Sequence, residues 1–136
     1  MMSACGVLCS GCPAYLGDAR GVAHQERTAA AWKRIYSLEE RAENIRCGGC
    51  LGPDEQMFHT SRKCAARRCC RAKGLGSCAE CAVEQCADLE RAQAVWDGVP
   101  ELAGNLPPED FAAYAQPYCE HRRRLAEARS AGGRTR

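Results

Sequence analysis

The stretch CGVLCSGCPAY at residues 5–15 places Cys5, Cys9 and Cys12 in a C-x3-C-x2-C array near the start of the chain. A C-x2-C pair can direct two thiolates at one ion, because a tight turn converges the two side chains. Three thiols in one short segment make three quarters of a four-ligand metal site. The fourth ligand must come from further along the chain, and the candidates are Cys64, Cys69 and Cys86.

The same array also begins the radical enzymes, which hold an iron–sulfur cluster with three cysteines and leave one iron open. Such enzymes work inside a barrel, and barrel domains take roughly 200 residues or more. The chain has 136 residues, enough for one ordinary domain. It shows no nucleophile with an obvious base and no paired-carboxylate site. We therefore rank an enzyme last and expect no catalytic residues.

Twelve residues are cysteine, which is far above ordinary usage. The N-terminal residues MMSACGVLCSGC lack the basic and apolar regions of a secretory signal, and no apolar run approaches the ~18 residues of a membrane span. We therefore expect a cytoplasmic protein without a membrane partner. In a reducing compartment, clustered cysteines are metal ligands more often than disulfides.

Large apolar side chains are scarce, with two Trp and two Phe, although 46% of the residues are hydrophobic. Such a chain buries little apolar area, so metal coordination is expected to supply part of the folding free energy. The predicted fold is a small, mainly α, metal-stabilised domain whose helices are joined by cysteine-rich knuckles and loops, with little or no β-sheet. We expect a single domain over 1–129, with a helical extension at 107–129 and a disordered tail at 130–136.

Helical spacing and capping signals predict the positions of the helices. The expected helices span 18–36, 37–44, 61–73, 78–96 and 107–129, the last kinked or split at Pro117. Ser37 with Glu40 and Ser77 with Glu80 form capping-box patterns that would start the second and fourth of these helices. The glycines at 74–76 would end the third.

Two further C-x2-C pairs are candidate metal ligands. In Cys47-Gly-Gly-Cys50 the glycines permit the backbone of a tight turn, and Cys78 and Cys81 would lie at a helix N-terminus, where backbone N–H groups stabilise thiolate charge. Together the two pairs predict a four-thiolate zinc site. For the N-terminal triplet an iron–sulfur cluster is favoured, since Cys12-Pro13 resembles part of a ferredoxin array.

The segment 61–73 carries six Lys and Arg residues and no acidic residue. Clustered cations can bind nucleic acid. They can also neutralise the negative charge of a four-thiolate metal site, and we favour this second interpretation because no aromatic residues interleave the basic ones. His121–Arg124 is expected to form a solvated helix face, and His59 an exposed loop residue rather than a ligand.

The ordered series CGVLCSGCPAY, CGGCLG and C-x4-C-x8-CAEC resembles a family of short bacterial and archaeal proteins catalogued as domain of unknown function number 3795. The resemblance covers roughly residues 4–96 and implies a cysteine-ligated metal protein without an assigned activity. The family pattern matches Cys5, Cys9, Cys12, Cys47, Cys50, Cys64, Cys69, Cys78, Cys81 and Cys86. Cys70 and Cys119 lie outside the pattern, and Cys119 is expected to be a buried apolar residue.

These observations lead to three hypotheses. The first is a non-catalytic module with two four-cysteine sites, holding zinc or [4Fe–4S], that binds a protein partner. The second is an iron–sulfur protein that transfers electrons, and the third is a protein that handles or senses metal. Zinc and iron–sulfur clusters both accept four thiolates, so the ligand type alone leaves the metal open.

Overall fold

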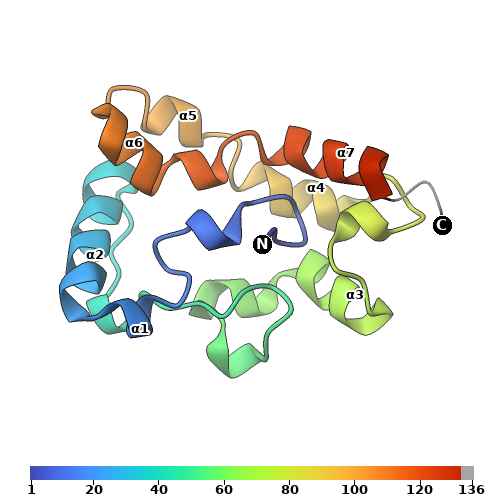
Figure 1. Cartoon of the computed structure of the whole chain (residues 1–136), viewed down its shortest axis with the longest axis horizontal. Helices are drawn as coiled ribbons and strands as arrows, with labels where there is room; N and C mark the ends of the chain where they lie inside the picture. The colour runs from blue at the N-terminus through green and yellow to red at the C-terminus, as the bar shows by residue number, and fades with distance from the viewer. Residues whose placement is uncertain (133–136) are drawn as a thin grey trace.

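The computed structural model describes residues 1–132 and shows a small, mainly α-helical, cysteine-rich domain (Figure 1). Within these residues there is no β-sheet, only two isolated bridges, Met2 with Leu8 and Tyr15 with Cys47. The expected fold class is thus confirmed in its helical content and its lack of a sheet. None of the described helices combines the length and apolar character that a membrane crossing requires.

Short helices and 3-10 turns alternate along the chain. In order they are η1 (Cys9–Gly11), α1 (Gly17–Arg20), α2 (Val22–Tyr36), η2 (Ala42–Asn44), η3 (Asp54–Gln56), η4 (His59–Lys63), α3 (Ala65–Lys73), η5 (Cys78–Glu80), α4 (Ala87–Ala94), α5 (Val99–Leu102), α6 (Pro108–Tyr114), η6 (Gln116–Tyr118) and α7 (His121–Gly132).

The N-terminal segment 3–8 runs through the middle of the molecule, between α3 on one side and the C-terminal helices on the other (Figure 1). Its backbone is hydrogen-bonded to distant parts of the chain. The amide of Cys78 donates to the carbonyl of Ala4 at 2.9 Å, and the amide of Leu8 donates to the carbonyl of Pro117 at 2.9 Å. A buried segment without regular structure needs such partners, because unpaired backbone groups are costly away from water.

Gly6 shows how closely the last helix approaches this segment. Its φ is +108°, and a Cβ there would lie 2.1 Å from the carbonyl oxygen of His121. Arg124 of α7 also donates to the Gly6 carbonyl at 2.7 Å. Glycine is therefore required at this position both for backbone conformation and for space.

The helix expected over 18–36 forms as α1 and α2, separated at Gly21, whose φ is +102°. The expected helix over 37–44 is wrong. Ser37 adopts a left-handed conformation that ends α2, and only the short turn η2 follows. The Glu40 carboxylate pairs with His59 at 2.6 Å, so it does not serve a capping box.

The expected helix over 78–96 is wrong in its first half. The Ser77 hydroxyl does accept a hydrogen bond from the amide of Ala79, and Glu80 accepts one from the amide of Gly76. These bonds close only the turn η5, and α4 begins at Ala87. The expected end of the preceding helix is confirmed, because Gly74 caps α3 with a φ of +69°.

The C-terminal region divides at Pro117, as expected, into α6, η6 and α7. Between the helices expected over 78–96 and 107–129, the chain forms the short helix α5. Helix α7 reaches Gly132 and so extends into the expected tail at 130–136, of which residues 133–136 lie outside the described part of the chain.

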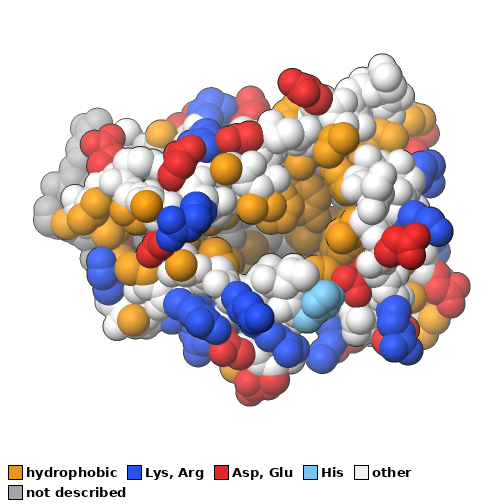
Figure 2. All heavy atoms as spheres, turned by 180° about the vertical axis from the view of Figure 1, so that it is seen from behind, with side chains coloured by type: hydrophobic (Ala, Val, Ile, Leu, Met, Phe, Trp, Pro, Cys, Tyr) orange, Lys and Arg blue, Asp and Glu red, His pale blue; other side chains and the backbone are white. Residues whose placement is uncertain are grey.

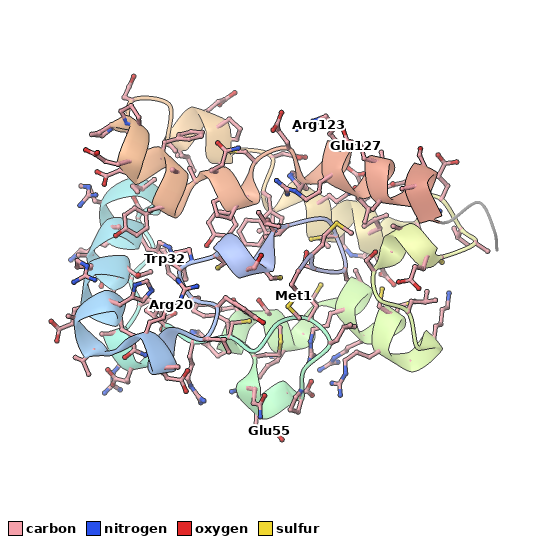
Figure 3. The ribbon with its side chains drawn as sticks, viewed as in Figure 1. Met1, Arg20, Trp32, Glu55, Arg123 and Glu127 are labelled. Carbon is pink, nitrogen blue, oxygen red and sulfur yellow. The ribbon has the colours of Figure 1, made fainter. Side chains whose placement is uncertain are left out.

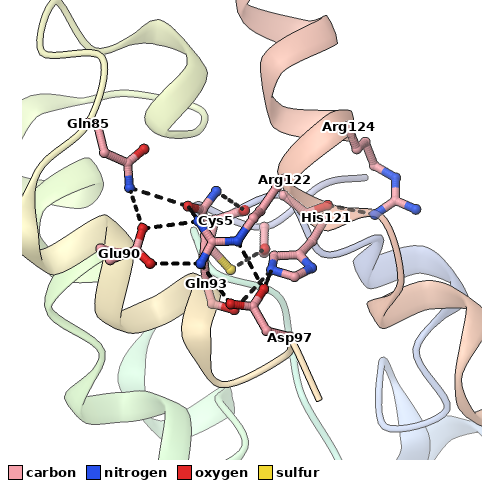
Figure 4. A network of polar contacts seen from close by, with 10 residues as sticks. Cys5, Gln85, Glu90, Gln93, Asp97, His121, Arg122 and Arg124 are labelled. Atoms are coloured by element: carbon pink, nitrogen blue, oxygen red, sulfur yellow. Dashed lines mark hydrogen bonds and ion pairs between the residues drawn. The ribbon is translucent and has the colours of Figure 1, made fainter. Parts of the chain in front are cut away.

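The expected solvated face at His121–Arg124 is wrong for His121, although Arg123 is exposed. The His121 side chain is buried, with 4% exposure, and its Nε2 lies 2.9 Å from the carbonyl oxygen of Gln93. Arg122 donates to Asp97 and to Glu90, which joins α7 to the end of α4 (Figure 4). This network holds the last helix in place over the N-terminal segment.

Arg67 is a fully buried cation, with 0% of its surface exposed. Its guanidinium donates to the Asp54 carboxylate at 2.7 Å and to the Gly52 carbonyl at 2.6 Å. A buried guanidinium requires such partners, because removing a charge from water is expensive. Arg67 thereby connects α3 to the loop that follows Cys50.

Replacing Arg67 with methionine removes these charge-assisted bonds while keeping most of the side-chain length. We expect Arg67→Met to lower the free energy of unfolding by about 2–4 kcal/mol. The matched control is Arg68→Met, at the exposed neighbouring position of α3, with an expected effect within about 0.5 kcal/mol. Denaturant unfolding measures both, and equal effects in the two variants would contradict the anchoring role of Arg67.

Candidate metal centres

Two cysteine turns from distant parts of the chain meet in what we call cluster A. It consists of Cys9, Cys12, Cys47 and Cys50. The segment after Cys12 runs beside Cys47, where Tyr15 forms a parallel bridge and the amide of Leu16 donates to the Cys47 carbonyl at 2.9 Å. These bonds place the turn of Cys9 and Cys12 beside the turn of Cys47 and Cys50.

The turn over 47–50 has the geometry that its two glycines predict. Gly49 has a φ of +92°, and its amide donates to the Cys47 sulfur at 3.5 Å. An N–H group directed at sulfur stabilises the thiolate form, which is the form that binds metal. The turn is therefore suited to hold Cys47 as a ligand.

Cys9 and Cys50 share a hydrogen bond across cluster A. The bond from the Cys9 thiol, together with the charge of buried Arg67, lowers the pKa of Cys50 to about 6. The same bond, with burial, raises the pKa of Cys9. The two thiols therefore titrate as a pair, and the interaction between them favours the loss of one proton.

Cys12 is half-buried, and burial raises its pKa, while a hydrogen bond from Tyr118 opposes this. The Tyr118 hydroxyl lies 2.9 Å from the Cys12 sulfur. No local motif in the sequence relates Tyr118 to Cys12. This contact was therefore beyond sequence reasoning.

A second group of thiols, cluster B, lies where α3, η5 and the following loop meet. It consists of Cys69, Cys78, Cys81 and Cys86, with Cys70 beside them. The Cys70 and Cys78 sulfurs are 3.6 Å apart. Two sulfurs on one tetrahedral zinc ion are about 3.8 Å apart, given Zn–S bonds of ~2.3 Å. Cys70, which the sequence placed outside the ligand set, is thus a direct neighbour of Cys78.

Lys73 supplies a positive charge to cluster B. Its Nζ lies 3.9 Å from the Cys81 sulfur, and the thiolate charges of Cys69 and Cys81 raise the pKa of Lys73. This contact agrees with the expected charge compensation in the segment 61–73. Arg67 and Arg71 of the same segment are paired with Asp54.

Figure 2 shows Lys and Arg side chains on several parts of one face, with a group of them along its lower edge. Arg62, also in segment 61–73, has a half-buried side chain, and its carbonyl accepts a hydrogen bond from Arg68. Since several of the six cations are engaged with Asp54 or with sulfur, the segment offers less free charge than its sequence indicated.

Cys5 and Cys64 lie between the two clusters. The Cys5 sulfur is 3.4 Å from the Ser3 hydroxyl, and its electrostatic neighbours are Cys50, Cys64 and Cys78. The C-x3-C-x2-C array therefore does not converge as one set of three. Sulfur atoms lie along the strip between the N-terminal segment and α3 (Figure 3).

The pairing of cysteine turns differs from the expected one. We expected Cys47 and Cys50 to join Cys78 and Cys81, whereas their thiol contacts run to Cys9 and Cys12.

All twelve cysteines are free thiols, and Cys119 is buried, as expected. As they stand in residues 1–132, no three His, Cys, Asp or Glu side chains are close enough to hold a metal ion. In donor type, however, each cluster matches a four-thiolate site.

Comparison with known proteins agrees with the resemblance found in the sequence. A family model described as a protein of unknown function, DUF3795, matches residues 1–91, which contain every cysteine of both clusters. No curated protein and no solved structure matches the chain. Residues 92–132 lie beyond the matched region.

The hydrogen bond within cluster A predicts a thiolate at unusually low pH. In the reduced, metal-free chain, absorbance at 240 nm should show one thiolate forming with a midpoint near pH 6, the pKa of Cys50. Cys9→Ala should move this step upward, because it removes the donor, and Cys119→Ala should leave it in place. A titration without any thiolate below pH 8 would contradict the assignment.

Proposed function

The chain belongs to the DUF3795 family, and we propose that it is a cysteine-ligated metal-binding protein with two four-cysteine sites. Cluster A supplies the ligands of the first site and cluster B those of the second. Cys5 and Cys64 lie between the sites and are the two remaining thiols of the family pattern. The proposed role is that of a non-catalytic module that binds a protein partner.

The observation that carries this proposal is the convergence of two C-x2-C turns in cluster A. Tyr15, which follows the Cys9–Cys12 turn, forms a bridge with Cys47, and the amide of Leu16 donates to the Cys47 carbonyl at 2.9 Å. Turns of this kind, facing each other, are how proteins surround an ion with four thiolates. A metal ion would replace the shared proton of Cys9 and Cys50 and draw the sulfurs together.

A structural role follows from where the clusters lie. Cluster A joins the N-terminal segment to the loop after Ile45, and cluster B joins α3 to η5. The chain has few large apolar side chains to make these connections. Metal binding would tie the segments together and add directly to the folding free energy.

Electron transfer is the second candidate function, and the hydrogen bonds to sulfur favour it. The Gly49 amide, the Tyr118 hydroxyl and the Lys73 ammonium each contact a thiol of a cluster. Such contacts to sulfur set the reduction potential of an iron–sulfur cluster. They stabilise zinc thiolates as well, so the metal itself decides between the two functions.

Anaerobic purification followed by a visible spectrum and metal analysis tests the proposal. A colourless protein with about two zinc ions per chain is the result expected for the structural module. A brown protein with about four iron ions per site identifies [4Fe–4S] clusters and favours the electron carrier. A chain that holds no metal as purified, and takes up none when reconstituted, contradicts both.

Substitution of one ligand in each cluster tests the division into two sites. We expect Cys47→Ser and Cys81→Ser each to remove about half of the bound metal and to lower the midpoint of thermal unfolding, because coordination and folding are coupled. Cys119→Ser is the matched control and should keep the full metal content. If Cys47→Ser removes all the metal, the clusters form a single site.

A further inference from the structure

We propose that the C-terminal arm, residues 116–132, forms the outer shell of both metal sites and slows the release of their metal. Tyr118 is the positioning residue for cluster A, and Arg129 is the positioning residue for cluster B. This inference rests on the proposed function, and it adds a role for a segment that lies outside the family-matched residues 1–91.

Tyr118 is held rigidly with its hydroxyl at Cys12. The side chain is 4% exposed, and its ring stacks on Trp96 with centroids 4.8 Å apart and 9° between the planes. The hydroxyl lies 2.9 Å from the Cys12 sulfur. Because the ring is fixed by packing, the O–H group is already oriented toward the sulfur.

A buried hydroxyl in this place stabilises a metal thiolate. A sulfur bound to one metal ion keeps lone pairs that can accept a hydrogen bond, and a bond to an ionised acceptor is stronger than a neutral one. Such outer-shell partners orient the ligand and hold it on the metal. Without the donor, Cys12 would carry its charge in an apolar surrounding.

Arg129 contacts the backbone of the cluster B turn rather than its sulfurs. Its guanidinium donates to the carbonyls of Cys78 and Cys81, each at 2.7 Å, and to the carbonyl of Glu84 at 3.1 Å. The carbonyl of Val83 accepts as well, at 3.4 Å, so one planar group contacts four carbonyls of segment 78–84, which carries two of the four ligands. These bonds hold Cys78 and Cys81 in one relative orientation.

The arm is anchored between these two contacts. The Pro117 carbonyl accepts from the amide of Leu8 at 2.9 Å, and Arg124 donates to the Gly6 carbonyl at 2.7 Å. Helix α7 therefore lies across the N-terminal segment from one cluster toward the other (Figure 1). The arm reaches both sites, cluster A through Tyr118 of η6 and cluster B through Arg129 of α7.

The test uses cadmium as the probe, because ¹¹³Cd²⁺ binds thiolates and each site should give its own NMR resonance. The whole chain is loaded with ¹¹³Cd²⁺, the resonances are assigned with Cys47→Ser and Cys81→Ser, and their decay is followed after EDTA is added. We expect Tyr118→Phe to accelerate the decay of the cluster A signal roughly 10-fold and to leave cluster B unchanged. Arg129→Gln should do the reverse.

Arg123→Gln is the matched control, because Arg123 lies on the same helix but pairs only with Glu120 and Glu127 at the exposed surface. It should change neither decay. Equal acceleration of both signals in Tyr118→Phe and in Arg129→Gln would indicate general loosening and overturn the proposal, as would unchanged decay in both. Failure to take up cadmium at all would instead overturn the proposed function itself.

A second measurement needs no variant and holds even if Tyr118→Phe does not fold. In the cadmium-loaded wild-type chain, the hydroxyl proton of Tyr118 should show scalar coupling to the cluster A ¹¹³Cd through the Cys12 sulfur. A Tyr118 hydroxyl resonance without this coupling would show that the hydrogen bond is not made to a metal ligand, and would overturn the role of Tyr118.

Discussion

The fold depends on a buried N-terminal segment that has no regular structure of its own. Residues 3–8 occupy the middle of the molecule, and their backbone groups are paired with η5 through Cys78 and with η6 through Pro117. Each of these bonds joins parts of the chain that are far apart in sequence. Since unpaired buried backbone is costly, the segment can only stay in place if both neighbours do.

This central segment also determines where the cysteines meet. It carries Cys5 toward the strip between the clusters and leads into η1, which presents Cys9 and Cys12 to the glycine-rich turn of Cys47 and Cys50. Four buried core residues, Cys5, Cys70, Cys78 and Cys119, are cysteines that pack among apolar side chains. Under the proposed function, metal coordination and folding would be coupled in this chain.

Electrostatics support the same arrangement. Arg67 is buried beside cluster A and Lys73 lies against cluster B, so each group of thiols has a cation from α3 near it. Three of the six cations in segment 61–73 face an acidic side chain or a thiol of the protein, namely Arg67, Arg71 and Lys73.

Local signals in the sequence predicted local structure. The helical spacing over 18–36, the glycine that ends α3 and the break at Pro117 are all present, because each depends on residues a few positions apart. The capping box at Ser37 failed, since that residue instead ends the preceding helix in a left-handed conformation. The hydroxyl of Ser77 accepts the hydrogen bond expected of an N-cap, yet only the 3-10 turn η5 follows it and not a longer helix.

The spacing of the cysteines did not predict which C-x2-C turns lie next to each other in the fold. Every C-x2-C turn presents two thiols in a similar way. The path of the chain between the turns therefore determines which turn faces which. The contacts of Tyr118 with Cys12 and of Arg129 with η5 depend on the same long-range path. The list of thiols was available from the sequence, whereas their grouping was not.

X-ray absorption at the metal edge of the purified protein tests the central claim most directly, because it reports the atoms bound to the metal. The account predicts a first shell of four sulfur atoms at about 2.3 Å and no oxygen or nitrogen ligand. A shell that contains oxygen or nitrogen, or fewer than four sulfurs per metal, would contradict the assignment of these cysteines as two complete thiolate sites.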